Sequence, residues 1–237
     1  MSGGMAAWGE MIAALSLFFA SHIVPARPAI RERLHAAFGS GLYLVLYSVV
    51  SLIILGWLVV AAGRAPYVEL WPFATWQLWA PNIAMPVACW LAVSGVAAPN
   101  PFSIAGRDAA RFDPERPGIA GITRHPLIWG MTLWAISHLV PNGDLAHVIL
   151  FGLFAAFGVT GMAAMDARLG RRWGERVWAE RSRRTSLLPF AAIISGGLPV
   201  TRLSLDWRPL AVAAALYAVL VALHPWVIGV SPLPLHQ

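Results

Sequence analysis

Five histidines lie within or beside long apolar segments of this chain, where charged or polar side chains are rare. They are His22, His125, His138, His147 and His224. Neutral imidazole is the commonest side-chain ligand for metal ions and a frequent axial ligand of haem iron. Ionisable residues inside a membrane segment are costly and by default indicate a functional site. The pattern therefore indicates metal or cofactor chemistry, although each histidine could instead simply hydrogen-bond a carbonyl or cap a helix.

Two of these histidines have an arginine close by in sequence. Arg27 follows His22, and Arg124 directly precedes His125 and Pro126. Proline suits the first turn of a helix, whose free amide groups attract anions, so this second cluster predicts an anion pocket. Its guest would be a haem propionate, a phosphate or the carboxylate of a cofactor. The alternative is an ordinary helix start next to surface charge.

Such histidines need apolar helices to position them, and the amino-acid composition predicts such helices. The chain has 237 residues, of which 58% are hydrophobic and 12% charged, against about 25% charged in ordinary soluble domains. Mean hydropathy is +0.66. These values exclude a disordered chain and disfavour a soluble enzyme. Spanning helices need roughly 20 apolar residues, and six segments qualify, at about 5–24, 40–62, 82–98, 122–140, 145–165 and 209–230. We expect an all-α polytopic membrane helix bundle of about six transmembrane helices.

The formal charge of +6 sets the orientation of that bundle. All 17 basic residues are arginine, and only Arg64 lies on one side of the expected membrane. Because basic residues are enriched in cytoplasmic loops, the other side is cytoplasmic and both termini lie outside. We expect a multi-pass protein of a bacterial inner (cytoplasmic) membrane. The sequence pI near 10.7 is then a sign of topology, and nucleic acid is not an expected partner.

The segment 168–200 does not look like a span. Its first part, 168–184, mixes arginines with Trp173, Trp178 and other apolar residues, which predicts one amphipathic helix on the inner face near anionic headgroups. The apolar remainder, 187–200, is too short to cross and is expected to be interfacial or re-entrant. The whole chain, 1–237, is expected to be a single integral membrane domain with membrane lipids as partners.

The chain resembles a known family through several motifs in order. These include FFASHIVPARPAIRERL, GLYLVLYSVVSL, GWLVVAAGRAPYVELW, TRHPLIWGMTLWAISHL and TSLLPFAAI. They are similar to the NnrU membrane protein family over roughly residues 8–195. The family's name comes from an association with denitrification genes. Its relatives include the plant zeta-carotene isomerases, which hold haem b and isomerise a cis double bond of a lipophilic substrate. The resemblance implies that His22 and His138 are haem ligands, and that His125 belongs to an Arg-His-Pro motif.

Helix geometry leaves the ligand pair open. His138 lies 13 residues after His125, or about 20 Å along a helix, whereas two axial ligands of one iron lie only about 4 Å apart, given metal–nitrogen bonds near 2 Å. His22 with His125 fits the expected depths. His22 with His138 requires a bend in the first span, which the prolines after it allow. His138 could alternatively face His224.

A more distant resemblance links the chain to the isoprenylcysteine carboxyl methyltransferases. The matching residues are Arg124, His125, Pro126 and Gly130. The resemblance implies S-adenosylmethionine as the alternative cofactor. However, Met165 and Asp166 stand where that group has two glutamates, and Ile128 and Val177 replace tyrosines, which disfavours methyl transfer.

Three functions follow from these residues and resemblances. The first is a haem-b inner-membrane protein with isomerase-like or redox chemistry on a lipophilic substrate, or with a role linked to denitrification. The second is an S-adenosylmethionine-dependent membrane methyltransferase. The third is a non-catalytic assembly or regulatory factor for respiratory or denitrification enzymes. The sequence does not decide whether the protein is an enzyme.

Overall fold

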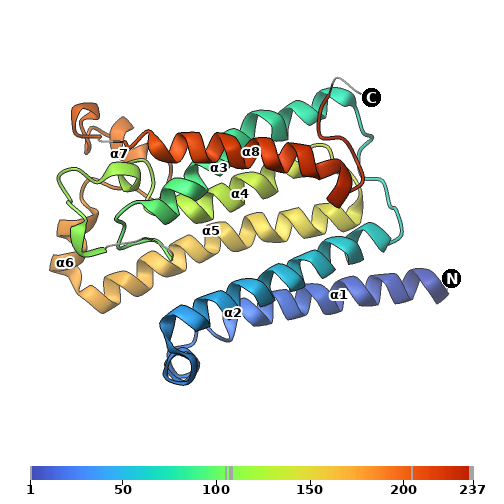
Figure 1. The fold of residues 1–237 in the computed structure, drawn as a ribbon, viewed down its shortest axis with the longest axis horizontal. Helices are drawn as coiled ribbons and strands as arrows, with labels where there is room; N and C mark the ends of the chain where they lie inside the picture. Colours follow the sequence, from blue (N-terminus) through green and yellow to red (C-terminus); the bar gives the residue numbers. More distant parts are fainter. Residues whose placement is uncertain (1, 105, 107–108, 204, 235–237) are drawn as a thin grey trace. The chain divides into compact units, whose positions relative to one another are not determined.

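The fold consists of helices joined by short irregular segments (Figure 1). The computed structural model describes residues 2–104, 106, 109–203 and 205–234. The longer helices are α1 (Ser2–Ile23), α2 (Pro28–Arg64), α3 (Trp79–Ala97), α4 (Pro126–Leu139), α5 (Leu145–Trp173) and α8 (Arg208–Val227). The shorter ones are α6 (Glu175–Ser182), α7 (Ala191–Ile194), η1 (Thr75–Leu78), η2 (Ala109–Arg111), η3 (Gly118–Gly121) and η4 (Val200–Arg202). No strand occurs among the described residues beyond one isolated bridge between Glu69 and Asp144. The all-α prediction is confirmed.

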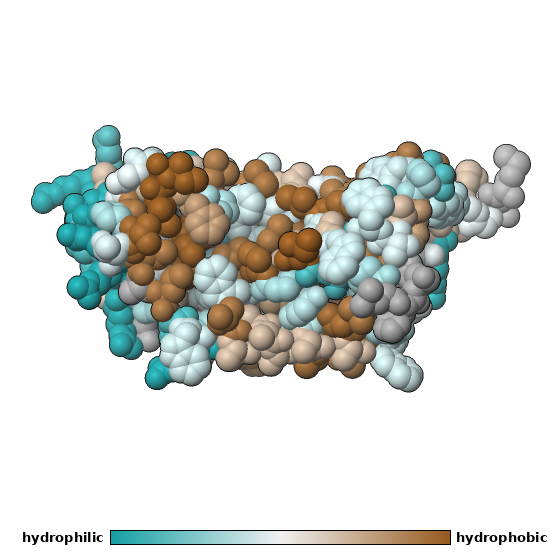
Figure 2. Space-filling model, turned by 90° about the horizontal axis from the view of Figure 1, so that it is seen from above, coloured by the Kyte–Doolittle hydropathy of each residue, from teal (hydrophilic) through white to brown (hydrophobic). Residues whose placement is uncertain are grey.

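Five of the described helices are long and apolar enough to cross a membrane, as in a multi-pass membrane protein. They cover Gly3–Ile23, Gly41–Arg64, Thr75–Ala97, Leu145–Trp173 and Arg208–Val227. Figure 2 shows apolar side chains over the middle of one face and hydrophilic ones gathered at the end where α6 lies. An apolar exterior of this kind suits a lipid environment.

The fourth expected span, 122–140, is shorter than the sequence predicted. Its helix, α4, has 14 residues and is therefore about 21 Å long, against roughly 30 Å for the hydrocarbon core. The helix begins only at Pro126 because His125 before it has a non-helical backbone, with φ −120° and ψ 59°. A count of six spans and the outside location of the termini stay predictions.

The structure divides into two compact units. The first contains Met1–Pro72 with Gly143–Leu150, and the second contains Phe73–Asn142 with Phe151–Gln237. We describe each unit by itself. The prediction of one integral membrane domain stays a prediction.

In the first unit α1 packs against α2. The buried face of α1 carries Met11, Ala14 and Phe18, which recur at the three- and four-residue spacing of a helix face. α2 contains one break, at Gly39, whose φ of 70° is a conformation that other residues rarely adopt. The long run 40–64 after this break is the part of α2 that is apolar enough to span.

In the second unit α3 packs against both α4 and α8. Small residues allow α3 and α4 to approach closely. A Cβ atom added to Gly130 would lie 2.6 Å from the carbonyl oxygen of Ala88, and one added to Gly95 would lie 2.7 Å from the amide nitrogen of Leu127. Close backbone approach at small residues is typical of helix packing in membranes.

Replacing Gly130 by alanine is therefore expected to destabilise the protein by about 1–3 kcal/mol, the usual cost of overpacking. The backbone of α3, which the new methyl group meets, cannot rotate away as a side chain can. The apparent Tm of the detergent-solubilised protein measures the effect. Gly152→Ala is the matched control, because a Cβ at Gly152 meets no atom within 4 Å. Equal apparent Tm values for the two variants would contradict the close approach.

The predicted amphipathic helix at 168–184 is in fact two helices. Residues 168–173 continue α5, and α6 begins only at Glu175. Gly174 separates them with a φ of 77°, which turns the chain at a position that favours glycine. The prediction of one continuous helix was therefore wrong, and α6 is only eight residues long.

Candidate functional site

The residues Arg124, His125, Asp166 and Thr185 meet at one end of the second unit, in what we call the Arg124 cluster. Arg124 donates from Nε to Asp166 Oδ2 at 2.9 Å and from Nη2 to the same oxygen at 2.5 Å. Its Nη1 donates to the carbonyl of Thr185 at 3.2 Å. The guanidinium group also lies over the ring of Trp178, 5.4 Å from its centroid. The Arg124 side chain is thus engaged on every nitrogen.

The backbone around this cluster is fixed by neighbouring segments. The amide of Arg124 donates to the Ser186 carbonyl at 2.9 Å, and Asn100 Nδ2 donates to the Arg124 carbonyl at 3.0 Å. The Thr123 hydroxyl donates to the Leu187 carbonyl at 2.9 Å. These bonds hold the residues before α4 in their irregular conformation and attach them to the segment after α6.

His125 is fully buried in this cluster. Its Nε2 lies 2.8 Å from Asp166 Oδ1, so this nitrogen donates its proton to the carboxylate. Its Nδ1 has no hydrogen-bond partner among the described residues. The nitrogen that reaches farthest from the backbone is therefore already used, which leaves His125 a poorly placed ligand for a large cofactor.

His138 lies at the other end of α4, in the last helical turn. Its Nδ1 is 2.8 Å from the carbonyl oxygen of Trp134. A carbonyl can only accept, so Nδ1 carries the proton and the lone pair lies on Nε2. The ring packs against the rings of Trp134 and Phe151, with centroids 5.7 and 5.4 Å away.

His22 has the same local geometry at the end of α1 in the first unit. Its Nδ1 is 2.8 Å from the carbonyl oxygen of Phe18, so its lone pair also lies on Nε2. The ring lies 4.3 Å from the ring of Phe18 and 5.7 Å from that of Tyr47, measured between centroids. In both units the last turn of a helix thus carries a histidine held in one tautomer by the carbonyl four residues earlier.

The two histidines share a sequence as well as a geometry. Residues 21–25 read Ser-His-Ile-Val-Pro, and residues 137–141 read Ser-His-Leu-Val-Pro. In each case the serine hydroxyl donates to the carbonyl three residues before it, at 2.7 and 3.0 Å. Metal-ligating histidines typically donate their second nitrogen to a carbonyl in this way.

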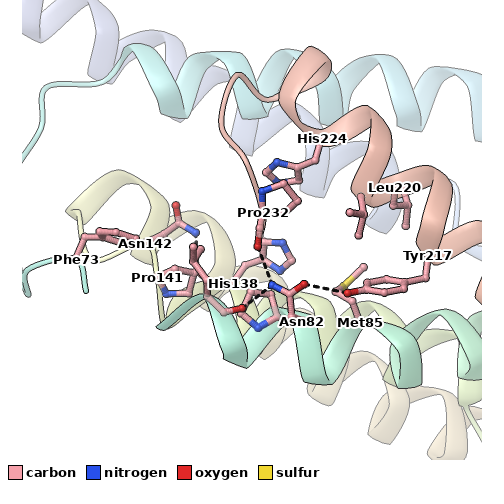
Figure 3. A pocket seen from close by; sticks show the side chains of 13 residues that line it. Phe73, Asn82, Met85, His138, Pro141, Asn142, Tyr217, Leu220, His224 and Pro232 are labelled. Carbon is pink, nitrogen blue, oxygen red and sulfur yellow. Dashed lines mark hydrogen bonds between the residues drawn. The ribbon is translucent and has the colours of Figure 1, made fainter. Parts of the chain in front are cut away.

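A cavity of about 220 Å³ in the second unit is lined by His138, together with residues of α3 and α8 (Figure 3). His224 of α8 lines the same cavity. In the first unit, a cavity of about 210 Å³ is lined by Ser21 and Pro25, which are the first and last residues of the Ser-His segment that contains His22. Each of the two Ser-His segments therefore borders a cavity.

Comparison with known proteins decides the family. A family model described as "NnrU protein" matches residues 10–232, which is nearly the whole chain. This chain belongs to the NnrU family.

The NnrU chain is also similar to two plant enzymes. It is 33% identical over 97 residues to the chloroplastic 15-cis-zeta-carotene isomerase of Zea mays, and 35% identical over 98 residues to that of Arabidopsis thaliana. Each match covers 41% of this chain and 26% of the relative, so the chain spans about a quarter of the length of these relatives. No solved structure matches.

The structure separates the predicted site residues of this NnrU protein into three places. His22 and the exposed Arg27 lie in the first unit, and Arg124 with His125 lies at one end of the second. His138 lies at the other end of α4. His125 and His138 are therefore not brought together, and the assignment of any of these residues to a cofactor stays a prediction.

Sequence reasoning missed two features of the NnrU site. It treated Asp166 only as a departure from a methyltransferase pattern, whereas the structure makes this carboxylate the shared partner of Arg124 and His125. A single acid directly after the predicted span 145–165 was the available signal. It also missed the repeated Ser-His segment, which a comparison of residues 21–25 with 137–141 would have revealed.

Proposed function

We propose that this NnrU protein is a haem-b protein of a bacterial inner membrane with isomerase-like chemistry on a lipophilic substrate. The observation that carries the proposal is the matched geometry of His22 and His138, each with its lone pair on Nε2. Similarity to two 15-cis-zeta-carotene isomerases supports the reaction class. Two variants of this haem-protein proposal are redox chemistry on the same kind of substrate and a role linked to denitrification enzymes.

The residues present fit haem b as axial ligands. Neutral imidazole is a frequent haem ligand, and a fixed tautomer with a hydrogen-bonded second nitrogen strengthens such ligands. His138 meets this requirement better than His125, whose Nε2 is bound to Asp166. In this proposal His138 is therefore the candidate ligand of the second unit in preference to His125, and His22 is the candidate ligand of the first unit.

The two candidate arginines differ in what they offer a propionate. Arg27 is exposed at the start of α2, close in sequence to His22. Arg124 is committed to Asp166 and Thr185, so a propionate would have to displace an internal partner. Arg27 is the propionate partner in this proposal, because a charge-assisted bond there breaks no existing contact.

The protein's own contribution would be to bind and orient a lipophilic molecule. Bound haem supplies one-electron chemistry at a conjugated double bond. The apolar walls of the two cavities would hold a polyene in place and exclude water from it. The aromatic rings around His22 and His138 would fix the planes of the two imidazoles.

The proposed topology has six crossings and both termini outside. α4 packs against α3, which is itself a candidate span. The turn η3 and the residues before Pro126 would extend α4 towards the cytoplasmic surface. The arginine-rich segment after α5 would then lie on that surface, in agreement with the enrichment of basic residues in cytoplasmic loops.

An absorption spectrum of the purified full-length protein tests the proposal. We expect a Soret band and a pyridine haemochrome of the b type when the protein is made in haem-replete cells. A colourless protein would overturn the proposal. If the colourless protein bound S-adenosylmethionine in calorimetry, the methyltransferase alternative would gain support, and binding of neither would favour a non-catalytic factor.

A further inference from the structure

Internal hydrogen bonds already use the donors of Asn82 and Tyr217, two polar residues that line the second-unit cavity (Figure 3). Asn82 Nδ2 donates to the carbonyls of Leu78 and Pro232, at 2.8 and 2.7 Å. The Tyr217 hydroxyl donates to Asn82 Oδ1 at 3.0 Å. Both amide protons of Asn82 and the hydroxyl proton of Tyr217 are thus used within the protein.

The remaining polar groups of this cavity offer mainly acceptors. His224 Nδ1 lies 2.8 Å from the Val230 carbonyl and so carries the proton, which leaves the lone pair on Nε2, as in His138. Asn142 Nδ2 donates one of its two amide protons to the His138 carbonyl at 2.8 Å, which leaves the second amide proton and Oδ1 for a ligand. A ligand that matches this lining must offer a donor to the histidine nitrogens.

The residues that line the cavity also indicate whether the ligand that binds there is a neutral hydrogen-bond donor or a cation. Its other residues are apolar or proline: Phe73, Leu78, Pro81, Met85, Pro141, Leu220, Val221 and Pro232. No carboxylate lines the cavity, and no group of three metal-ligating side chains occurs among the described residues. An unpaired cation in apolar surroundings is strongly unfavourable. A neutral hydroxyl satisfies the acceptors without that cost.

We propose that this cavity binds the hydroxyl-bearing end of a neutral lipophilic molecule, with His224 Nε2 as the hydrogen-bond acceptor. This names a substrate class for the proposed function and rests on it, since His138 Nε2 is there reserved for iron. The substrate would then differ from a pure hydrocarbon at one end. The hydroxyl has a single proton to donate, so Asn142 contributes its remaining amide proton to the hydroxyl oxygen, and its Oδ1 is the acceptor for a neighbouring donor.

The size of the cavity supports the binding of one end of a molecule. Pockets that enclose a whole drug-sized ligand measure about 300–1,000 Å³, and this one measures about 220 Å³. The remainder of a long lipophile would lie outside the cavity, against exposed apolar side chains or lipid. A hydroxyl is the smallest neutral group that donates a hydrogen bond, which suits this volume.

The test compares an alcohol with its matched hydrocarbon on the purified full-length protein in lipid nanodiscs. The probes are tritiated farnesol and the hydrocarbon in which hydrogen replaces its hydroxyl. We expect the alcohol to bind about fivefold or more tightly, since one hydrogen bond contributes roughly 0.5–1.5 kcal/mol. His224→Phe should remove this preference, and His224→Gln, which keeps an acceptor, should restore part of it.

Leu223→Phe is the matched control, because Leu223 neighbours His224 on α8 but is 49% exposed. It should retain the preference. Equal binding of alcohol and hydrocarbon by the unaltered protein, or an unchanged preference in His224→Phe, would overturn the inference. The Soret band is recorded on each sample. A retained alcohol preference in samples that lack a Soret band would overturn the haem proposal alone.

Discussion

Replacing His138 by alanine is expected to abolish the Soret band of the purified protein, and His22→Ala is expected to do the same. Each substitution removes an imidazole at the end of an apolar helix whose Nδ1 is bound to the carbonyl four residues earlier and whose lone pair lies on Nε2. Loss of an axial ligand weakens haem binding, because most of the affinity of the iron for the site is lost with it. Absorbance at the Soret maximum per mole of protein, measured against the unaltered protein, gives the occupancy.

His125 and His35 provide the comparisons for this experiment. His125→Ala should retain the band in whatever fraction folds, because Asp166 occupies its Nε2. His35→Ala tests a histidine of α2 that the proposal does not use. His138→Met guards against simple misfolding, since a thioether can ligate iron and should give a shifted band in place of none. A full band in His138→Ala would contradict the assignment of this ligand.

Replacing Asp166 by alanine is expected to destabilise the protein by about 3–5 kcal/mol, the usual cost of removing one partner of a buried ion pair. The side chains of Arg124 and Asp166 are each only 13% exposed, and that of His125 is not exposed at all. Without the carboxylate, the Nε and Nη2 donors of Arg124 and the N–H of His125 lose their acceptor in a nearly dry site. The apparent Tm in detergent, together with the yield of monodisperse protein, measures the loss.

Two further variants separate the charge of Asp166 from its hydrogen bonds. Asp166→Asn keeps one acceptor oxygen and should cost less than Asp166→Ala. Glu175→Ala removes an exposed acid at the start of α6 and should change the apparent Tm little, as surface substitutions usually do. If Asp166→Ala were as stable as Glu175→Ala, the Arg124 cluster would not be the structural link that its contacts indicate.

The chain's hydropathy was enough to predict helices in a membrane. Long apolar runs such as 40–62 contain no charged residue. In lipid their backbone N–H and C=O groups can form hydrogen bonds only within the segment, so such runs form helices wherever they pack. The short start of α4 could not be predicted in the same way. The apolar pattern continues back to Ile122, but the helix begins only at Pro126, because the backbone amide of Arg124 donates to the Ser186 carbonyl and His125 is not helical.

Residue types and local spacing likewise determined which histidines to consider. The contact of His22 and His138 with a carbonyl four residues earlier is a local helix property. A pattern of Ser-His, then Ile or Leu, then Val-Pro marks both segments in the sequence itself. What only the tertiary structure decided is which groups meet across helices. Asp166 of α5 takes the far nitrogen of His125, and His224 of α8 shares a cavity with His138 of α4. The reason is physical: hydropathy fixes that a helix forms, whereas its rotation and the partner of each polar atom follow from packing of side chains distant in sequence.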